Sequence, residues 1–429
     1  MRKTASTIAA LTLLGGLLAA CSNDKNNASG SPSASEASDP SSAASASNSE
    51  PKLSGKIVFA TNRTDKADST IRDLADEFEK LHPGTSVEIE GITDGNTLKT
   101  RAAANELPDV GIPIPDLPLE KMPDYYLPQD DLGFSADTIS FYDYNKVDGK
   151  VYGIPISAGY QGIVYNKKAF AEAGITTAPK TLDEMLADSE KLKEKGIIAL
   201  ATSYKDGWPV GYYTATLPME MAGDPDWYGK LADSDTLYNE DNYSIAVLDF
   251  LTQMNDKGYL EPDLMSANWE NQKRLHAQGK LAMAYLGTWY PSQLADNGAN
   301  IEDIGMFPFP GIKTISGGPD GSLFISKNTE NPDLAKAFVK YCIENGRFAI
   351  ATGSIPSDKN AQPPAYVTEL LSSGLPVITS SPTSSKIQDI INKGNINMTG
   401  NLQEYIVSKK DKQAGLIAKW NKQFQDAKK

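Results

Sequence analysis

The stretch Asp148–Gly196 reads DGKVYGIPISAGYQGIVYNKKAFAEAGITTAPKTLDEMLADSEKLKEKG, and it decides the fold. Two apolar runs with strand-like composition, Val151–Ile156 and Gly162–Tyr165, stand on either side of the small, pliable segment SAGYQ. A hinge must absorb dihedral change without melting the packed units that it joins, and an extended segment with small residues suits that task. The stretch therefore predicts two lobes joined by a hinge, with Tyr160 at the floor of the cleft between them.

Length and charge narrow the class of protein. A chain of 429 residues exceeds the size at which one hydrophobic core stops growing, so two domains are expected. A composition of 40% hydrophobic and 22% charged residues is ordinary for a soluble globular protein. The formal net charge of −14 opposes binding to nucleic acid and to anionic membrane surfaces. Neutral or cationic ligands fit this charge better.

The N-terminus has the pattern of an export signal. Arg2-Lys3 forms a basic start, and the apolar run Ile8–Ala20 is too short for a stable membrane span. The run ends in LAAC at Cys21, which resembles a bacterial lipobox and implies acylation of that cysteine after cleavage before it. An ordinary signal peptide with a chance cysteine is the alternative. We expect a lipoprotein signal peptide over residues 1–20 and a disordered tether over 21–52, which holds no large apolar side chain.

Cysteine usage predicts no disulfide. Besides Cys21 the chain has only Cys342, which shares one helical face with Ala335, Phe338 and Val339. That spacing predicts a small buried core residue.

Residues 56–112 alternate between strand-like and helix-like segments. Strands are expected at Lys56–Ala60, Ser86–Glu90 and Pro108–Ile112, and helices at Ile71–His82 and Thr97–Asn105. This order predicts an α/β lobe with a largely parallel sheet. Ligands of such sheets bind beyond the carboxyl ends of the strands, so the loops Thr61–Asp65, Ile92–Asn96 and Pro113–Leu117 are candidates.

The second half of the chain predicts another α/β unit. Its expected elements are a helix capped by Thr181, strands at Ile197–Ala201, Leu281–Leu286 and Ile304–Phe309, an aromatic loop at Ser203–Tyr213 and a helix at Ser244–Asp256. A glycine-rich crossing at Pro310–Asp320 returns the chain to the first lobe, and a third crossing is expected near Thr352–Pro356. We therefore assign residues 53–158 and 312–350 to an N-terminal lobe, and 159–311 and 351–429 to a C-terminal lobe.

The sequence holds no recognisable enzyme signature. His82 and His276 lack partners at metal-ligand spacing, and the acidic segment Asp233–Tyr238 lacks the oxygen ligand and glycine of a calcium loop. Neither a Walker-type phosphate loop nor a Gly-x-Ser-x-Gly elbow occurs. We expect no catalytic residue, metal or cofactor, and hence a protein that is not an enzyme.

Aromatic, amide and acidic residues in the expected loops suit a sugar. Sugar faces lie flat on aromatic rings, and sugar hydroxyls pair with carboxylate and amide groups. The candidates are Asn62, Arg63, Asp65, Asp94, Asn96, Asp116, Tyr160, Trp208, Trp227, Trp269, Trp289 and Tyr290. Each tryptophan can instead be a packing residue, as we expect of Trp420, and Asp94 and Asn96 can simply form a turn.

Four segments carry a family resemblance. They are GKVYGIP with VYNK at residues 149–167, AGI with PKT at 173–181, LHAQGKLAM with GTW at 275–289, and MFPFP with SKN at 306–328. From about Lys52 onward the chain resembles bacterial extracellular solute-binding protein family 1, the sugar-binding components of ABC importers, a group that includes maltose-binding protein. The resemblance implies a two-lobed periplasmic-binding-protein-like fold that acts as a monomer.

The resemblance also implies roles for single residues. In relatives the tryptophan at the position of Trp289 stacks on sugar, and the positions of Asn62 and Asp116 hold ligand. Ala60 stands where maltose-binding protein has an aromatic residue, and Gly159 stands where it has an acid, which argues against maltose itself.

The function implied is capture of a neutral mono- or oligosaccharide by hinge closure and its delivery to ABC permease subunits. The protein would act at the extracellular face of the bacterial cell membrane, held to the bilayer only by its acylated Cys21. A peptide, polyamine or other small solute as ligand, a sensory role, and a surface glycoside hydrolase remain alternatives.

Overall fold

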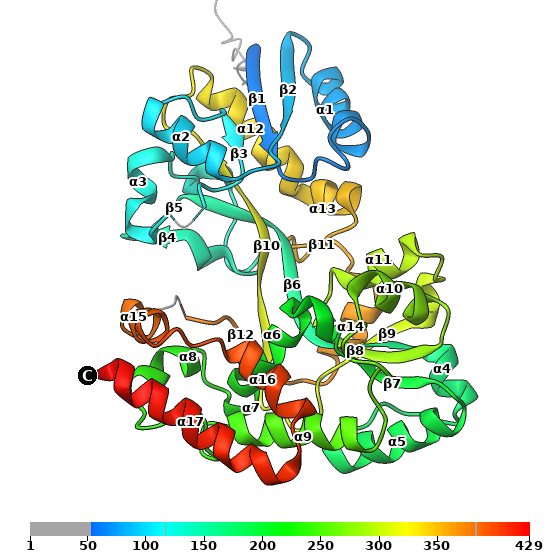
Figure 1. Cartoon of the computed structure of the whole chain (residues 1–429). Coiled ribbons are helices and arrows are strands. Elements are labelled where there is room, and N and C mark those ends of the chain that lie inside the picture. Colours follow the sequence, from blue (N-terminus) through cyan, green and yellow to red (C-terminus); the bar gives the residue numbers. More distant parts are fainter. Residues whose placement is uncertain (1–52, 116, 382–383) are drawn as a thin grey trace, which may run out of the picture. The chain divides into compact units, whose positions relative to one another are not determined.

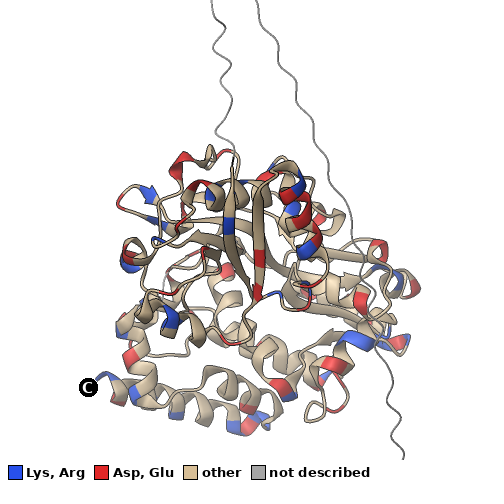
Figure 2. Ribbon diagram, turned by 90° about the horizontal axis from the view of Figure 1, so that it is seen from above, with Lys and Arg blue, Asp and Glu red and all other residues tan. Residues whose placement is uncertain are grey.

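The computed structural model describes residues 53–115, 117–381 and 384–429. The predicted signal peptide, the tether and Cys21 lie outside these residues, and so does Asp116. No helix within the described ranges is long and apolar enough to cross a membrane. Basic and acidic side chains are interspersed over the outer helices and loops (Figure 2).

Strands β1 (Gly55–Thr61), β2 (Thr85–Gly91) and β3 (Val110–Gly111) pair in parallel in the order β2-β1-β3. Helices α1 (Thr70–Leu81) and α2 (Asn96–Ala104) connect them, which confirms the predicted α/β order. The buried face of α1 carries the predicted residues Ile71, Leu74, Ala75 and Phe78. Helix α12 (Pro332–Ile343) completes this core, which buries Cys342 as predicted.

Strand β6 (Gly153–Asn166) is continuous, so the apolar residues on both sides of SAGYQ and the small residues between them form one extended strand, as expected of a strand that crosses between two packed units. The junction residues are held by pairing with β10 (Ile315–Ile325), since Ser157, Ala158, Gly159 and Tyr160 face residues of that strand in an antiparallel ladder. Backbone hydrogen bonding to a neighbour keeps small residues extended where their own propensity does not.

The second half of β6 enters a different set of strands. It pairs in antiparallel fashion with β8 (Leu281–Gly287) and β9 (Ile304–Phe307), and β7 (Ile198–Ala201) lies parallel to β8. One mixed sheet therefore runs in the order β2-β1-β3-β10-β6-β8-β7. Figure 1 shows β6 and β10 side by side between its two ends.

Two main groups of buried side chains lie along this sheet. We call the group that includes Ile57, Ile156 and Leu323 the first core, and the group that includes Ala158 and Ile315 the second core. Strands β6 and β10 thus each pass from one core to the other. The short strand β11 (Ile355–Pro356) adds a third connection by pairing with β6 at Ser157 and Ala158.

The lobe boundaries given above remain a prediction. The packing favours a return crossing within β10, between Ile315 of the second core and Leu323 of the first core. That crossing lies a few residues beyond the expected start of the N-terminal segment at residue 312.

Helices cover the second core. A capping box between Thr181 and Glu184 starts α5 (Leu182–Glu194), and α9 (Ser244–Asp256) has its predicted bounds. Trp420 of α17 (Lys410–Lys428) is 2% exposed, so it packs as expected. The other strands and α-helices are β4 (Lys146–Val147), β5 (Lys150–Val151), β12 (Val377–Ile378), α3 (Met122–Tyr125), α4 (Lys167–Glu172), α6 (Trp208–Thr214), α7 (Thr216–Ala222), α8 (Trp227–Lys230), α10 (Trp269–Ala277), α11 (Tyr290–Asp296), α13 (Arg347–Thr352), α14 (Ala365–Leu371), α15 (Ser385–Gly394) and α16 (Met398–Val407).

The expected aromatic loop at Ser203–Tyr213 is largely helical, because α6 spans Trp208–Thr214. Gly207 precedes it with φ of 75°, and Pro209 occupies the first turn, where its missing N–H costs nothing. The loop prediction was therefore wrong, since a glycine and a proline that read as loop signals here begin a helix.

Glu220 of α7 ties the start of β10 to the second core. The side chain is fully buried, its Oε1 accepts a hydrogen bond from the Ser316 N–H at 2.6 Å, and its Oε2 accepts one from the Tyr285 hydroxyl at 2.5 Å. Desolvation raises the pKa of Glu220 from 4.5 to about 8, although both hydrogen bonds oppose the rise. The carboxyl is therefore mostly protonated at neutral pH.

Replacing Glu220 by Gln should remove one component of the pH dependence of stability. Between 4.5 and about 8 the folded state holds a proton that the unfolded state releases, so stability falls as pH rises through this window. The contribution is about 1.4 kcal/mol per pH unit. Urea unfolding from pH 5 to 9 should show a shallower decline for Glu220→Gln than for the wild type. Glu120→Gln, at an exposed position, is the control, and parallel curves for Glu220→Gln would contradict the assignment.

Candidate ligand-binding site

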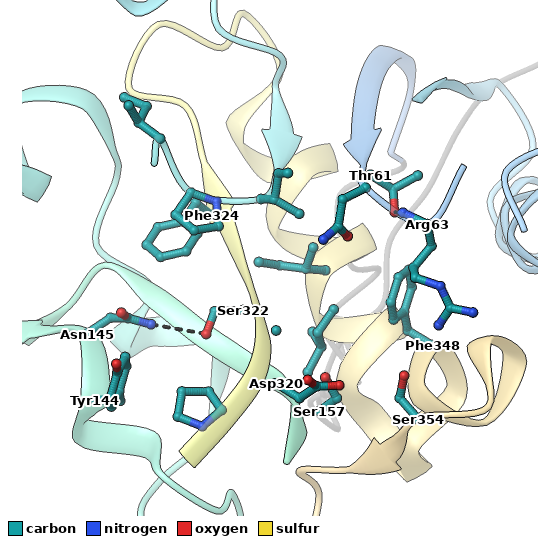
Figure 3. A pocket seen from close by; sticks show the side chains of 18 of the residues that line it. Thr61, Arg63, Tyr144, Asn145, Ser157, Asp320, Ser322, Phe324, Phe348 and Ser354 are labelled. Atoms are coloured by element: carbon teal, nitrogen blue, oxygen red, sulfur yellow. Dashed lines mark hydrogen bonds between the residues drawn. The ribbon is translucent and has the colours of Figure 1, made fainter. Parts of the chain in front are cut away.

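Two adjoining cavities lie where the loop after β1 meets β6 and β10, and Figure 3 shows the first of them. The first has a volume of about 580 Å³ and the second about 470 Å³. Arg63, Asp320 and Ser354 line both, so we treat them together as the junction site. The carboxyl ends of β1 and β3 reach the first cavity, which is where parallel sheets place their ligands.

The two cavities differ in character. The walls of the first are largely apolar, and its side chains include Phe59, Thr61, Asn62, Ile112, Ile114, Tyr144, Asn145, Ser157, Ser322, Phe324 and Phe348. The second is polar, and its side chains include Asp65, Lys273, Thr288, Trp289, Ser292, Gln293, Asp296, Asn297 and Thr352. A ligand that fills both would meet apolar surface at one end and charged groups at the other.

Arg63 is held rigidly at the boundary between the cavities. Its Nε and Nη2 donate to the two carboxylate oxygens of Asp65 at 2.9 Å each, and its Nη1 donates to the Thr352 carbonyl at 2.8 Å. The hydrogen bond and the opposite charge raise the pKa of Arg63 and lower that of Asp65. A guanidinium has five N–H donors, so two remain for a ligand.

Asp320 also stands at this boundary, and sequence reasoning did not select it. The pairing of β10 with β6 shifts register between Pro319 and Gly321, so Asp320 is the unpaired residue of a β-bulge. In Figure 3 its carboxylate lies beside Ser157, and Arg63 and Ser354 project into the same space. The only sequence signal was an acid within the glycine-rich crossing.

Three tryptophans gather at the second cavity. Trp208 begins α6, Trp269 begins α10 and Trp289 precedes α11, and their ring centroids lie 4.8 to 5.9 Å apart. Trp289 lines the cavity, and Trp208 is 44% exposed despite its contacts with the other two rings. We call Trp208, Trp269 and Trp289 the tryptophan cluster.

Two neighbours of the tryptophan cluster were missed in the sequence. Tyr212 lies one helical turn after Trp208, with ring centroids 6.4 Å apart, and its hydroxyl is hydrogen-bonded to the Trp289 side chain. Lys273 lies on α10 with its Nζ 5.5 Å from the centroid of the Trp269 ring, and it forms an ion pair with Glu270 at 2.8 Å. The helical spacing of residues 208 and 212 was the available signal for Tyr212.

Asn145 shapes the floor of the first cavity and was also missed. Its amide donates to the Gly153 carbonyl at 2.9 Å and to the Ser322 hydroxyl at 3.2 Å, a contact drawn in Figure 3. The buried amide thus links β6 to β10 beneath the site.

The structure brings together only part of the predicted site. Asn62, Arg63, Asp65 and Trp289 line the cavities, and Trp208 and Trp269 contact Trp289. Asp116 lies outside the described residues.

The other predicted site residues line neither cavity. Trp227 is 5% exposed and its indole N–H donates to the Asn242 carbonyl, whereas Tyr290 is fully buried against Gln272. Asp94 and Asn96 are bonded to each other in an exposed turn. The ring of Tyr160 packs on Phe141, with centroids 5.8 Å apart. We leave these five residues out of the proposed site.

Among the described ranges no group of three or more His, Cys, Asp or Glu side chains is arranged to hold a metal ion. The lining residues of the junction site offer stacking on an aromatic ring and hydrogen bonding to amide, hydroxyl, guanidinium and carboxylate groups.

Two cores joined by β6, β10 and β11, with a polar site at the junction, define a two-lobed binding-protein fold, as predicted. A chain from Bifidobacterium animalis subsp. lactis, an ABC transporter binding protein in complex with mannobiose, has this fold with a TM-score of 0.66. The two are 25% identical, and the alignment covers 88% of this chain and 95% of that one.

The family model described as bacterial extracellular solute-binding protein matches residues 62–346. The chain therefore belongs to this family, which confirms the predicted family. It is 27% identical over 298 residues to the multiple sugar-binding protein of Streptococcus mutans, covering 65% of this chain and 69% of that protein. It is 24% identical over 316 residues to the melibiose/raffinose/stachyose-binding protein MelE of Bacillus subtilis, covering 70% and 73%.

Replacing Gly287 by Ala should displace Trp289. A Cβ at residue 287 would lie 2.5 Å from the indole Nε1 of Trp289, so one of the two side chains must move. We expect a shift in tryptophan emission and a stability loss of about 1–3 kcal/mol from overpacking.

Gly415→Ala is the matched control, because an added Cβ there meets nothing within 4 Å. The emission shift should vanish when Gly287→Ala is made together with Trp289→Phe. An unchanged emission spectrum in the single variant would show that the indole does not rest on Gly287.

Proposed function

We propose that this chain is the substrate-binding protein of an ABC importer and binds a neutral mono- or oligosaccharide at the junction site without enzymatic activity. The observation that carries the proposal is the tryptophan cluster beside Arg63 and Asp320. Sugar rings stack on aromatic faces, and their hydroxyls form hydrogen bonds with carboxylate and guanidinium groups. The cited relatives are described as sugar-binding proteins, which supports the same ligand class here.

Ligand capture would use the connections between the two cores. Asn62 follows β1 of the first core, whereas Trp289 follows β8 of the second core, so a ligand that contacts both favours the arrangement that brings them together. Strands β6, β10 and β11 would act as the hinge, because each connects the two cores. Permease subunits would receive the ligand from this closed form.

The location proposed for the protein is the extracellular face of the bacterial cell membrane. The support is the N-terminal sequence, in which LAAC ends the apolar run and supplies Cys21 for acylation. A diacyl anchor with a tether leaves the binding domain free to meet its permease.

A cationic ligand such as a polyamine or basic peptide is the second candidate. The second cavity favours it because Asp65, Asp296 and Asp320 all line that cavity. Binding of a cation should weaken strongly with added salt, whereas sugar binding should respond little.

Formation of hydrolysis products from oligosaccharides would instead indicate a glycoside hydrolase.

Replacing Trp289 by Ala should weaken saccharide binding more than tenfold, or about 1.4 kcal/mol and above, because stacking area is lost. Calorimetry with the neutral saccharide that binds best among mannobiose, raffinose and stachyose measures the change. Trp289→Phe should recover part of the affinity, and the thermal midpoint of each variant monitors folding. Unchanged affinity in Trp289→Ala would remove this residue from the site.

A further inference from the structure

We propose that Asp320 selects uncharged saccharides over anionic ones, its carboxylate accepting hydrogen bonds from two neighbouring ligand hydroxyls. This inference rests on the proposed function and assigns the discrimination to one residue.

The backbone aims the Asp320 side chain into the site. Pro319 pairs with Ala158 and Gly321 pairs with Ser157, so consecutive residues of β6 face β10 residues that are two apart. The extra residue is Asp320, and β-bulges re-aim side chains in this way. A regular ladder at this point would leave no unpaired residue in β10.

The place of Asp320 is shared by both cavities. It lines the first cavity with Ser157 and Ser354, and it lines the second with Trp289 and Lys273. A ligand stacked on Trp289 that extends toward the first cavity must therefore pass this carboxylate.

The carboxylate of Asp320 is free to bind a ligand. Among the described residues it accepts no hydrogen bond and joins no ion pair, although the residue faces a site rich in polar groups. A carboxylate has about four lone-pair positions and can accept two hydroxyl donors at once. Vicinal hydroxyls of a sugar supply donors at a matching separation.

The uncompensated charge at the second cavity is negative. Arg63 is paired with Asp65, and Lys273, which lines the cavity, is paired with the exposed Glu270. Neither Asp296 nor Asp320 forms an ion pair among the described residues, although the charge of Arg63 acts on both. An anionic group on the ligand, such as the carboxylate of a uronic acid, would be repelled at short range.

The ionisation of Asp320 fits this assignment. Partial desolvation raises the pKa of the Asp320 carboxyl, although the residue keeps exposed surface, and the positive charge of Arg63 opposes the rise. The charged and titratable groups around it are Arg63, Asp65, Tyr144, Tyr212, Lys273 and Asp296. Affinity for a neutral sugar should therefore decline on acidification, because a protonated carboxyl no longer accepts two hydroxyl hydrogen bonds.

The test compares neutral and anionic sugars of equal size on wild-type protein and on Asp320→Asn. The probes are β-1,4-mannobiose with β-1,4-dimannuronate, and galactobiose with digalacturonate, measured by calorimetry. Wild type should prefer the neutral member of a pair by about a hundredfold, since like charges at short range cost several kcal/mol. Asp320→Asn should lose about tenfold in neutral affinity and reduce the preference by about tenfold.

Two further variants separate the effect of charge from the effect of geometry and control for the loss of a surface charge. Asp320→Glu keeps the charge but moves the oxygens, so it should lose neutral affinity yet still reject the anionic sugar. Asp137→Asn removes the same charge at an exposed position away from the cavities and should change neither value. Thermal midpoints of all variants monitor folding.

The outcomes are separable. If the wild type binds a neutral sugar and Asp320→Asn changes neither the affinity nor the preference, the role of Asp320 is overturned while the proposed function stands. If the wild type binds no saccharide at all, both are overturned. A wild type that binds dimannuronate as tightly as mannobiose also overturns the selection proposed here.

Discussion

The antiparallel ladder between β6 and β10 is the constraint on which the rest of the structure depends. It joins Gly153–Tyr160 to residues 317–324, and it is the point where the two cores meet. The second half of strand β6 pairs with β8 and β9, so the same strand also fixes the part of the sheet that lies against the second core. Loss of this ladder would separate the two cores, and the residues that line the junction site would no longer lie together.

The ladder is also irregular, with register shifts between Pro319 and Gly321 and between Gly321 and Ser322, and the first of these shifts supplies chemistry. A bulge costs pairing at one residue, and here the residue is an acid flanked by proline and glycine. Pro319 has no N–H to lose, and Gly321 has no side chain to obstruct the turn of the backbone. The local sequence therefore lowers the cost of the bulge that presents Asp320.

The fold follows from local signals more completely than the site does. The periodicity of α1, the cap at Thr181 and the burial of Cys342 depend on neighbours in the sequence, and all three were predictable. Trp227 and Trp289 are both expected outside strands and helix interiors. The Trp227 indole N–H donates to the Asn242 carbonyl, whereas the Trp289 indole packs against Gly287. Such choices depend on contacts between distant segments, which composition and spacing do not report.

The same limit applies to residues that were overlooked. The bulge at Asp320 exists only because the pairing of β10 with β6 shifts register there. No pattern within residues 310–320 specifies the partner strand. Tyr290 shows the converse, since it directly follows Trp289 but points into the second core, where it is fully buried. Adjacent residues at the start of a helix face different directions, so proximity in sequence to a binding residue predicts little.

The distribution of the site over the fold has a consequence for the proposed hinge closure. Ser157 and Asp320 lie on the strands that connect the cores, so rotation about these strands changes their separation little. Asn62 and Trp289 belong to different cores, so the same rotation changes the distance between them. A ligand would then be oriented first by Ser157 and Asp320 on strands β6 and β10. Only the contacts with Asn62 and Trp289 would differ between open and closed forms, and that difference is what a ligand needs to drive closure.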